Sequence, residues 1–131
     1  MRRVGLAEQL AMDMMELLGF DRAHDSSRPT RTMPPGYLRR LDIARAISTD
    51  PILLLADEPF SELTSTEAVN VGPTLLRLNS LGMTIIIVEH RLHYLKDIVH
   101  RVIGMHDGRV LAEGSLQEIM QGKKFKDIYY G

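Results

Sequence analysis

The chain has 131 residues, a length that suits one ordinary domain but is short for a complete nucleotide-hydrolysing module. Its formal net charge of -1 favours neither nucleic acid nor an anionic membrane surface as a partner, and the absence of cysteine excludes disulfides, thiolate nucleophiles and cysteine-rich zinc sites. No apolar run approaches the length of a membrane span, so we expect a cytoplasmic chain without direct membrane insertion.

The first third of the chain predicts two helices separated by a loop. Apolar residues recur at three- and four-residue steps over Leu6–Leu18, the spacing of one helix face, and Gly19 follows where a helix can end. The stretch 21–36 is rich in Asp, Ser, Arg, Thr and Pro, which is typical of a loop. Apolar periodicity then predicts a second helix over about Tyr37–Ser48.

Two short apolar runs in the middle of the chain predict strands of a parallel sheet that is covered on both faces. Ile52–Ala56 is continuously apolar and is followed by the acidic pair Asp57-Glu58. Thr84–Val88 is rich in β-branched residues and is followed by Glu89-His90. Between the two runs, Thr64-Ser65-Thr66-Glu67 fits a capping box and predicts the start of a further helix.

The C-terminal third predicts a helix, a hairpin and a last helical region. The helix is expected over about Leu92–His100. Strands Val102–Met105 and Val110–Ala112 are joined through Asp107-Gly108, a dipeptide that readily takes the positive φ angles of a tight turn. Ser115-x-x-Glu118 is a second capping box and predicts the final helix.

The alternation of helices and strands is typical of βαβ units, so we predict an α/β fold with a mainly parallel sheet flanked by helices. Ligands of such sheets bind beyond the carboxyl ends of the strands, where Asp57-Glu58 and Glu89-His90 fall. One acid there can hold Mg²⁺, and a second can orient and deprotonate an attacking water. Taken alone, the acidic pair is better explained as solvating the strand end, and a lone strand-end histidine is more often satisfied by backbone groups.

The order of several motifs changes that balance, because together they resemble the ATPases of ABC transporters. The first strand with its acids, Leu53–Pro59, is similar to the Walker B strand, and the second, Ile85–His90, resembles the switch-histidine strand. The upstream helix Arg39–Ile47 looks like the one after the signature sequence. The downstream segment Gly108–Ile119 resembles the closing hairpin and helix.

Within that family the likeness is closest to the ATPases of branched-chain amino-acid uptake. Arg39–Arg45 follows the second half of their signature region, and Ile128–Gly131 resembles their Ala-Tyr-Leu-Gly ending. ATPases of lipopolysaccharide export and urea uptake share much of the same pattern.

The resemblance implies a partial P-loop NTPase domain with a C-terminal hairpin. Residues 1–48 would form the end of the helical subdomain, with a degenerate signature region and the helix that follows it. Residues 49–131 would form the C-terminal part of the ATPase core.

The resemblance also implies roles for individual residues. Asp57 would support Mg²⁺, Glu58 would be the general base, and His90 would sense the γ-phosphate of ATP. An imidazole at a neighbouring strand end can donate a hydrogen bond to a transferring phosphoryl oxygen. Gly36, Asp57 and Ser61 would contact the nucleotide.

The chain departs from the family at the phosphate-binding loop and at the signature, among other positions. The phosphate-binding loop Gly-x-x-x-x-Gly-Lys-Ser/Thr is missing, and no lysine precedes Lys96. Where the family has Leu-Ser-Gly/Tyr-Gly-Gln, the segment Met33–Tyr37 keeps only Gly36, and two prolines remove backbone donors. We therefore expect a truncated piece that does not hydrolyse ATP alone.

Three functions are compatible with this pattern. The first is an ATP-binding and ATP-hydrolysing subunit of an ABC transporter, with branched-chain amino-acid import as the specific expectation. The alternatives are a non-enzymatic module that docks on a complete ABC ATPase or transporter, and one half of a split ATPase.

Each of these readings implies particular partners. ATP and Mg²⁺ would bind only with a partner that carries the Walker A loop. That partner would be a second ATPase subunit or the missing N-terminal half, and membrane-spanning transporter subunits would hold the chain at the inner face of the cell membrane. Without the front strands, a sheet edge and apolar surface should be left uncovered.

Overall fold

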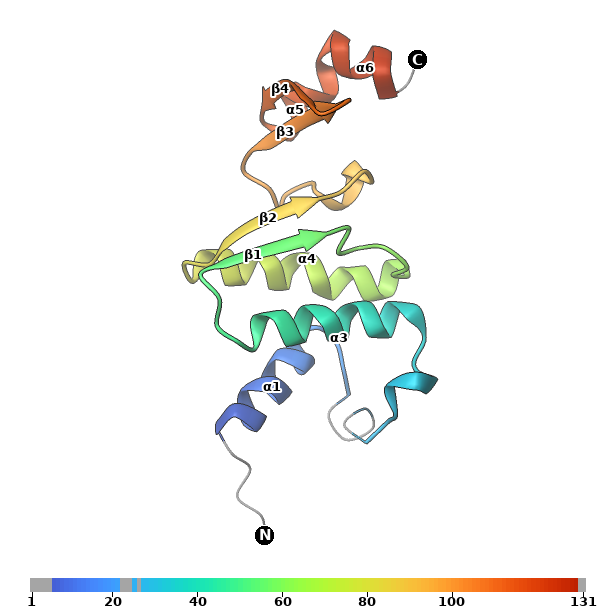
Figure 1. The fold of residues 1–131 in the computed structure, drawn as a ribbon, viewed down its shortest axis with the longest axis vertical. Coiled ribbons are helices and arrows are strands. Elements are labelled where there is room, and N and C mark those ends of the chain that lie inside the picture. Colours follow the sequence, from blue (N-terminus) through green and yellow to red (C-terminus); the bar gives the residue numbers. More distant parts are fainter. Residues whose placement is uncertain (1–5, 22–24, 26, 130–131) are drawn as a thin grey trace. The chain divides into compact units, whose positions relative to one another are not determined.

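The computed structural model describes residues 6–21, 25 and 27–129, which form two compact units (Figure 1). The first unit extends to Tyr94 and the second begins at Leu95. The expected division between residues 48 and 49 concerns subdomains of the family and stays a prediction. No helix in these described ranges is both long and apolar enough to cross a membrane.

The first unit begins with helix α1 (Leu6–Leu17), a 3-10 turn (Thr30–Thr32) and helix α3 (Pro35–Ile47). Of the predicted loop, residues 22–24 and 26 lie outside the described part. Helix α3 begins two residues earlier than predicted, because Pro35 occupies its first position. Proline suits that position, since its fixed φ is already helical and the N–H that it lacks would have no partner inside the helix.

A two-stranded parallel sheet follows, formed by β1 (Leu53–Asp57) and β2 (Thr84–Val88). Helix α4 (Ser65–Ser80) connects the strands. The predicted capping box at its start is confirmed: the Glu67 N–H donates to the Thr64 hydroxyl, and the Glu67 carboxylate accepts from the Thr64 N–H at 2.9 Å.

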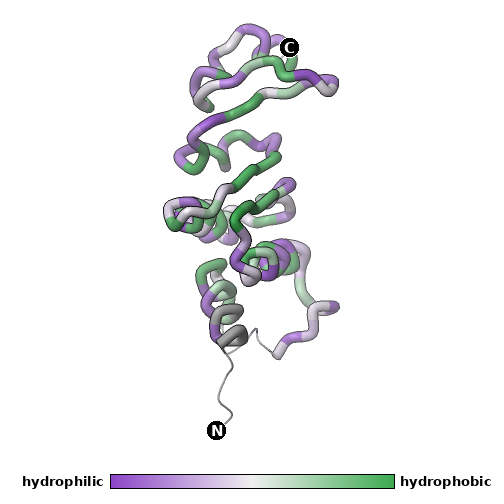
Figure 2. Tube along the Cα trace, turned by 60° about the vertical axis from the view of Figure 1, so that its left-hand side comes forward, coloured by the Kyte–Doolittle hydropathy of each residue, from purple (hydrophilic) through white to green (hydrophobic). Residues whose placement is uncertain are grey.

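The prediction that this sheet is covered on both faces is wrong in the described structure. Helices α3 and α4 lie on the same side of the sheet (Figure 1). On that side Leu54 is buried, whereas alternate residues leave apolar side chains exposed on the other: Leu53 45%, Leu55 69%, Ile86 53% and Val88 59%. Both strands are mostly apolar, which is why two covering layers were predicted (Figure 2). Within the described residues, helices pack on one face of the sheet, so the apolar side chains of the other face stay exposed. We call these four residues the open sheet face.

Arg40 ties the helices of the first unit together. Its guanidinium is almost fully buried and donates to the carbonyls of Leu18 and Gly19 at the end of α1, at 2.9 and 3.2 Å. It also pairs with Glu67 of α4 at 3.1 Å. These contacts offset much of the cost of burying the charge, although the Nε atom of Arg40 is buried without a hydrogen-bond partner. The apolar core of the first unit is formed mainly by Leu18, Ile43, Ala44, Ile47, Leu54, Phe60, Leu63, Val71 and Leu75.

The predicted helix over residues 92–100 is wrong. Only a single 3-10 turn forms there, Leu92–Tyr94. Asp97 takes a φ of 66°, which an α-helix cannot accommodate. The chain therefore forms a series of turns here, although its apolar residues have helical spacing.

The second unit is the predicted hairpin followed by short helices. Strands β3 (Val102–His106) and β4 (Arg109–Gly114) are antiparallel, and both turn residues, Asp107 and Gly108, have positive φ angles of 47° and 73°. Helix α5 (Leu116–Gln121) begins with the predicted capping box, and helix α6 (Lys123–Tyr129) follows. Of the expected family-like ending, residues 130 and 131 lie outside the described part.

Candidate functional site

The carboxyl ends of β1 and β2 bring the predicted catalytic residues together. Asp57 is in register with Val88, so the residues that follow each strand lie at the same edge of the sheet. The His90 Nδ1 atom is 3.1 Å from the Glu58 Oε1 atom. Both side chains are open to solvent, with 64% of His90 and 45% of Glu58 exposed, so an incoming ligand could reach them.

Glu58 owes its direction to an uncommon backbone conformation. Its φ of 47° lies in the left-handed region, which costs a non-glycine residue about 1–2 kcal/mol. The Glu58 N–H donates to the Val88 carbonyl at 2.8 Å, and the Ser61 N–H donates back to the Glu58 carbonyl at 2.9 Å. The turn is thus bonded to the neighbouring strand and to itself.

Arg39 is a component of the site that sequence reasoning did not single out. Its Nη2 atom donates to the carbonyls of Asp57 and Glu58 at 2.6 and 2.8 Å, and its Nε atom donates to the Glu58 carbonyl at 3.1 Å. In the sequence Arg39 carries only the signal of the signature-like helix, because a contact to main-chain oxygens leaves no pattern of residue types.

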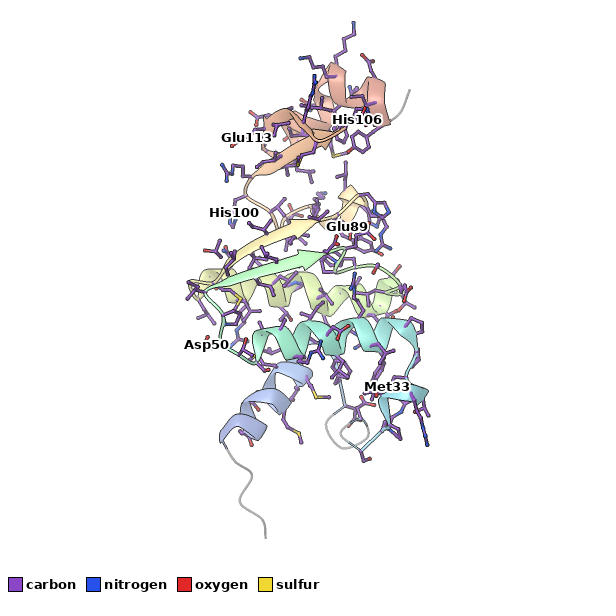
Figure 3. The ribbon with its side chains drawn as sticks, in the orientation of Figure 1. Met33, Asp50, Glu89, His100, His106 and Glu113 are labelled. Carbon is purple, nitrogen blue, oxygen red and sulfur yellow. The ribbon has the colours of Figure 1, made fainter. Side chains whose placement is uncertain are left out.

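Glu89 is the second component that the sequence left without a role (Figure 3). Its carboxylate is fully buried, and its Oε1 atom accepts from the N–H groups of His90 and Arg91, each at 3.0 Å. The same oxygen lies 3.6 Å from the His90 Nδ1 atom. This carboxylate therefore orders the chain after β2 and with it the position of the His90 ring.

Asp57 is the last residue of β1, and its predicted role as the Mg²⁺-supporting acid stays a prediction. Within the described residues, no group of three or more His, Cys, Asp or Glu side chains is arranged to hold a metal ion. Mg²⁺ in phosphoryl-transfer sites usually takes one or two carboxylates, with water and substrate phosphates as the other ligands. The Asp57 carboxylate at the end of β1 is compatible with that kind of site.

Gly36 and Ser61 are placed by packing and by the turn. A Cβ atom on Gly36 would lie 2.7 Å from Glu67 Oε2 and 2.9 Å from the Glu62 carbonyl, so the close approach of α3 to the loop before α4 requires glycine. Ser61 closes the turn after Glu58 through its N–H group. Their expected contacts with nucleotide stay predictions.

Glu67 supports this arrangement electrostatically. Burial alone would raise its pKa, but the hydrogen bonds from Thr64 and the neighbouring Arg40 guanidinium together lower the pKa below its ordinary value. The carboxylate is therefore held ionised beneath Gly36 at neutral pH.

A cavity of about 120 Å³ lies between α3 and β1, beside the turn. Pockets for drug-sized ligands usually measure about 300–1,000 Å³, so this cavity alone does not enclose a nucleotide. Its lining includes Arg39, Asp42, Leu55 and Asp57.

Comparison with known proteins gives one consistent group of relatives. No protein-family model matches the chain. The chain is 31% identical over 117 residues to an uncharacterized ABC transporter ATP-binding protein of Rhizobium meliloti, which covers 88% of the chain and 43% of that protein. It is 30% identical to the probable branched-chain amino acid transport ATP-binding protein LivG of Archaeoglobus fulgidus, over 92% of the chain and 46% of LivG. It is 35% identical to the methionine import ATP-binding protein MetN of Streptococcus pneumoniae, over 85% of the chain and 31% of MetN.

Solved structures give the same result. The ADP conformation of an ATP-binding cassette of an ABC transporter matches 99% of the chain with a TM-score of 0.81 and 25% identity, and 52% of that cassette is covered. A nucleotide-free ATP-binding cassette matches 95% of the chain with a TM-score of 0.82 and 25% identity, covering 50% of that chain. The chain thus spans less than half the length of these curated relatives and about half of these solved cassettes.

Proposed function

We propose that this chain, which belongs to the ATP-binding proteins of ABC transporters, supplies the acid and histidine side of an ATP-hydrolysis site. The observation that supports this proposal is the Glu58–His90 contact of 3.1 Å at the ends of two parallel strands, directly after Asp57. ATP would be the substrate and Mg²⁺ the metal ion.

In this proposal Glu58 accepts a proton from the water that attacks the γ-phosphate, and Asp57 supports Mg²⁺. Mg²⁺, when bound, neutralises charge on the phosphate oxygens. Because a carboxylate only accepts hydrogen bonds, the ring hydrogen in the pair with Glu58 lies on Nδ1 of His90. The Nε2 atom is then directed to a phosphoryl oxygen, and it donates there when the ring carries both hydrogens.

The phosphate-binding loop has to come from outside these 131 residues, because they contain no Gly-x-x-x-x-Gly-Lys-Ser/Thr segment. Another part of the same polypeptide or a separate chain would serve equally well. Without that loop, we expect these residues neither to hold nor to hydrolyse ATP.

A fused cassette tests the proposal. The Walker A-bearing part of the Archaeoglobus LivG relative is joined to this chain, and folding, binding of a fluorescent ATP analogue and ATP hydrolysis are measured separately. We expect hydrolysis in the fusion, none in the 131-residue chain, and loss of hydrolysis but not of binding in Glu58→Gln. A folded fusion that binds ATP and hydrolyses it equally well with Glu58→Gln would contradict the proposal.

The finer proposal is that the transporter imports branched-chain amino acids. The match to LivG and the likeness of Arg39–Arg45 to that signature region support it, while the match to methionine import proteins supports amino-acid import more broadly. The partners would be a second ATPase subunit and membrane-spanning subunits, with the chain in the cytoplasm at the inner face of the membrane. Uptake of leucine and of methionine in a strain lacking the gene would separate the two substrates.

The second candidate is a non-enzymatic docking module. The observation that favours it is the open sheet face, because contiguous exposed apolar surface commonly marks an interaction site. Docking would be favoured over catalysis if the chain binds a complete ABC ATPase and the ATPase activity of that enzyme is the same with the Glu58→Gln chain as with the wild-type chain.

A further inference from the structure

We propose that Arg39 is a positioning residue for Glu58: its guanidinium holds the carbonyls of the Asp57–Glu58 turn and thereby directs the Glu58 carboxylate to His90. The inference rests on the proposed function only in giving Glu58 a chemical role. Three hydrogen bonds of 2.6, 2.8 and 3.1 Å carry it.

The turn needs an external restraint because its conformation is unfavourable. Glu58 has a φ of 47°, and few residues other than glycine adopt that region without support. On one side the Glu58 N–H is bonded to the Val88 carbonyl of β2. On the other side its carbonyl accepts from Arg39 of α3, so the peptide is held from two separate elements.

The chemistry of the guanidinium suits this task. Its planar fork presents several N–H donors in fixed directions, so it can bond two adjacent carbonyls at once, which a single ammonium group does less well. The three contacts are to main-chain oxygens, so the Glu58 carboxylate stays available for its contact between Oε1 and His90 Nδ1. Arg39 thus fixes the backbone beneath the carboxylate while the carboxylate contacts the histidine.

The side chain of Arg39 is in place for this role because of where it lies in α3. It follows Gly36, the residue that allows the start of α3 to approach the loop before α4. Arg45, six residues further along the same helix, makes a useful contrast. Its side chain is 83% exposed and pairs with Asp42 of the same helix at 3.5 Å.

The test is nuclear magnetic resonance of the 131-residue chain with ¹⁵N-labelled histidine, comparing Arg39→Gln with Glu58→Gln, Arg39→Lys and the control Arg45→Gln. Glu58→Gln reports the ring-nitrogen resonances of His90 without the Glu58 carboxylate. We expect Arg39→Gln to move them in the same direction and Arg39→Lys to move them less, because lysine keeps a charged donor group although not the planar fork. Arg45→Gln should leave them unchanged.

A merely structural Arg39 gives a different result. Arg39→Gln would then lower the melting temperature while the His90 resonances stayed at their wild-type positions, and that outcome would overturn the proposal. If Arg39→Gln does not fold, the Arg39→Lys spectrum decides in the same way. The ring resonances do not depend on turnover, so an inactive fused cassette would contradict the proposed function without altering this result.

In a fused cassette that is active, Arg39→Gln should lower kcat by about tenfold to a hundredfold, the effect of a small misplacement of a catalytic group, with little change in KM for ATP. An unchanged kcat would count against the positioning role.

Discussion

The His90 Nδ1 atom lies 3.1 Å from the Glu58 Oε1 atom although the two residues are 32 positions apart in the chain. The contact exists because β1 and β2 are parallel neighbours and end at the same edge of the sheet. Each residue is held by a different device: Glu58 by a left-handed turn, and His90 by the buried Glu89 carboxylate that accepts its N–H group. The pair is therefore a product of the fold rather than of local sequence.

The first prediction is that Glu58 and His90 act as a unit in a fused cassette. Glu58→Gln and His90→Ala should each lower kcat by about 10²- to 10⁴-fold, the usual range for loss of a positioned acid or base. Because the two side chains are in contact, the double variant should be little worse than the more damaging single variant. Steady-state kinetics of the four proteins check this, and independent, multiplying effects would show that the contact has no part in turnover.

The second prediction concerns the charge of Glu67. Its pKa is lowered in the folded chain, so its carboxylate stabilises the fold at pH values above its unfolded value of 4.5, and this stabilisation is lost as the pH falls through the folded pKa. Glu67→Gln should cost about 1–3 kcal/mol at pH 7, since it leaves the buried Arg40 guanidinium without its charged partner. The difference from wild type should shrink as the pH drops below 4.5.

Urea unfolding at a series of pH values measures this difference. Glu118→Gln is the matched control, because Glu118 caps α5 in the same way and its pKa is also lowered by the Ser115 hydrogen bonds, but it is fully exposed. We expect the same sign of pH dependence and a smaller effect. A Glu67→Gln difference that grew toward acidic pH would contradict the assignment.

Much of the local structure was predictable because it depends on short-range chemistry. Both capping boxes, the Asp107-Gly108 turn and the two parallel strands follow from residue types within a few positions of each other. The helix expected over 92–100 does not form, although its apolar spacing suits a helix. The reason is the left-handed backbone conformation of Asp97, which residue types do not encode strongly.

The site itself was predictable only in part. The strand-end residues could be found because they follow apolar runs, and the order of motifs linked them to one family. Arg39 could not, since it bonds to carbonyl oxygens that every residue possesses. The open sheet face agrees with the expectation that apolar surface is left uncovered without the front strands, although strand composition alone does not show it, because an apolar strand looks the same whether one or two layers cover it.

The third prediction is that Gly36→Ala destabilises the chain by about 1–3 kcal/mol, the range for an added methyl group in a packed site. The added Cβ atom would lie 2.7 Å from Glu67 Oε2 and 2.9 Å from a main-chain carbonyl that cannot rotate away. Ala46, an exposed residue of the same helix, should show the opposite preference, with Ala46→Gly costing about 1 kcal/mol through helix propensity. Thermal unfolding measures both effects. A Gly36→Ala chain as stable as wild type would contradict the packing argument, and the proposed contact of Gly36 with nucleotide would then be the remaining explanation for the glycine.

The fourth prediction is that the open sheet face makes the 131-residue chain self-associate. Leu55 and Ile86 are paired in register on that face and are 69% and 53% exposed. Exposed apolar surface favours association, and so does a sheet edge that no other described strand pairs with, so the wild type should form larger species as its concentration rises. Leu55→Thr with Ile86→Thr should reduce this association while changing the free energy of unfolding by less than about 1 kcal/mol, because neither side chain is buried.

Sedimentation velocity over a range of concentrations checks this association, with two controls. Val69→Thr removes a side chain that is also exposed, 66%, but lies on α4, and it should leave association unchanged. Leu54→Ala, on the covered side of β1, should instead cost about 2–5 kcal/mol of stability, because that side chain is 7% exposed and its loss leaves a cavity. A wild-type chain that stays monomeric at high concentration would show that this face is satisfied without a partner, and the docking candidate would lose its supporting observation.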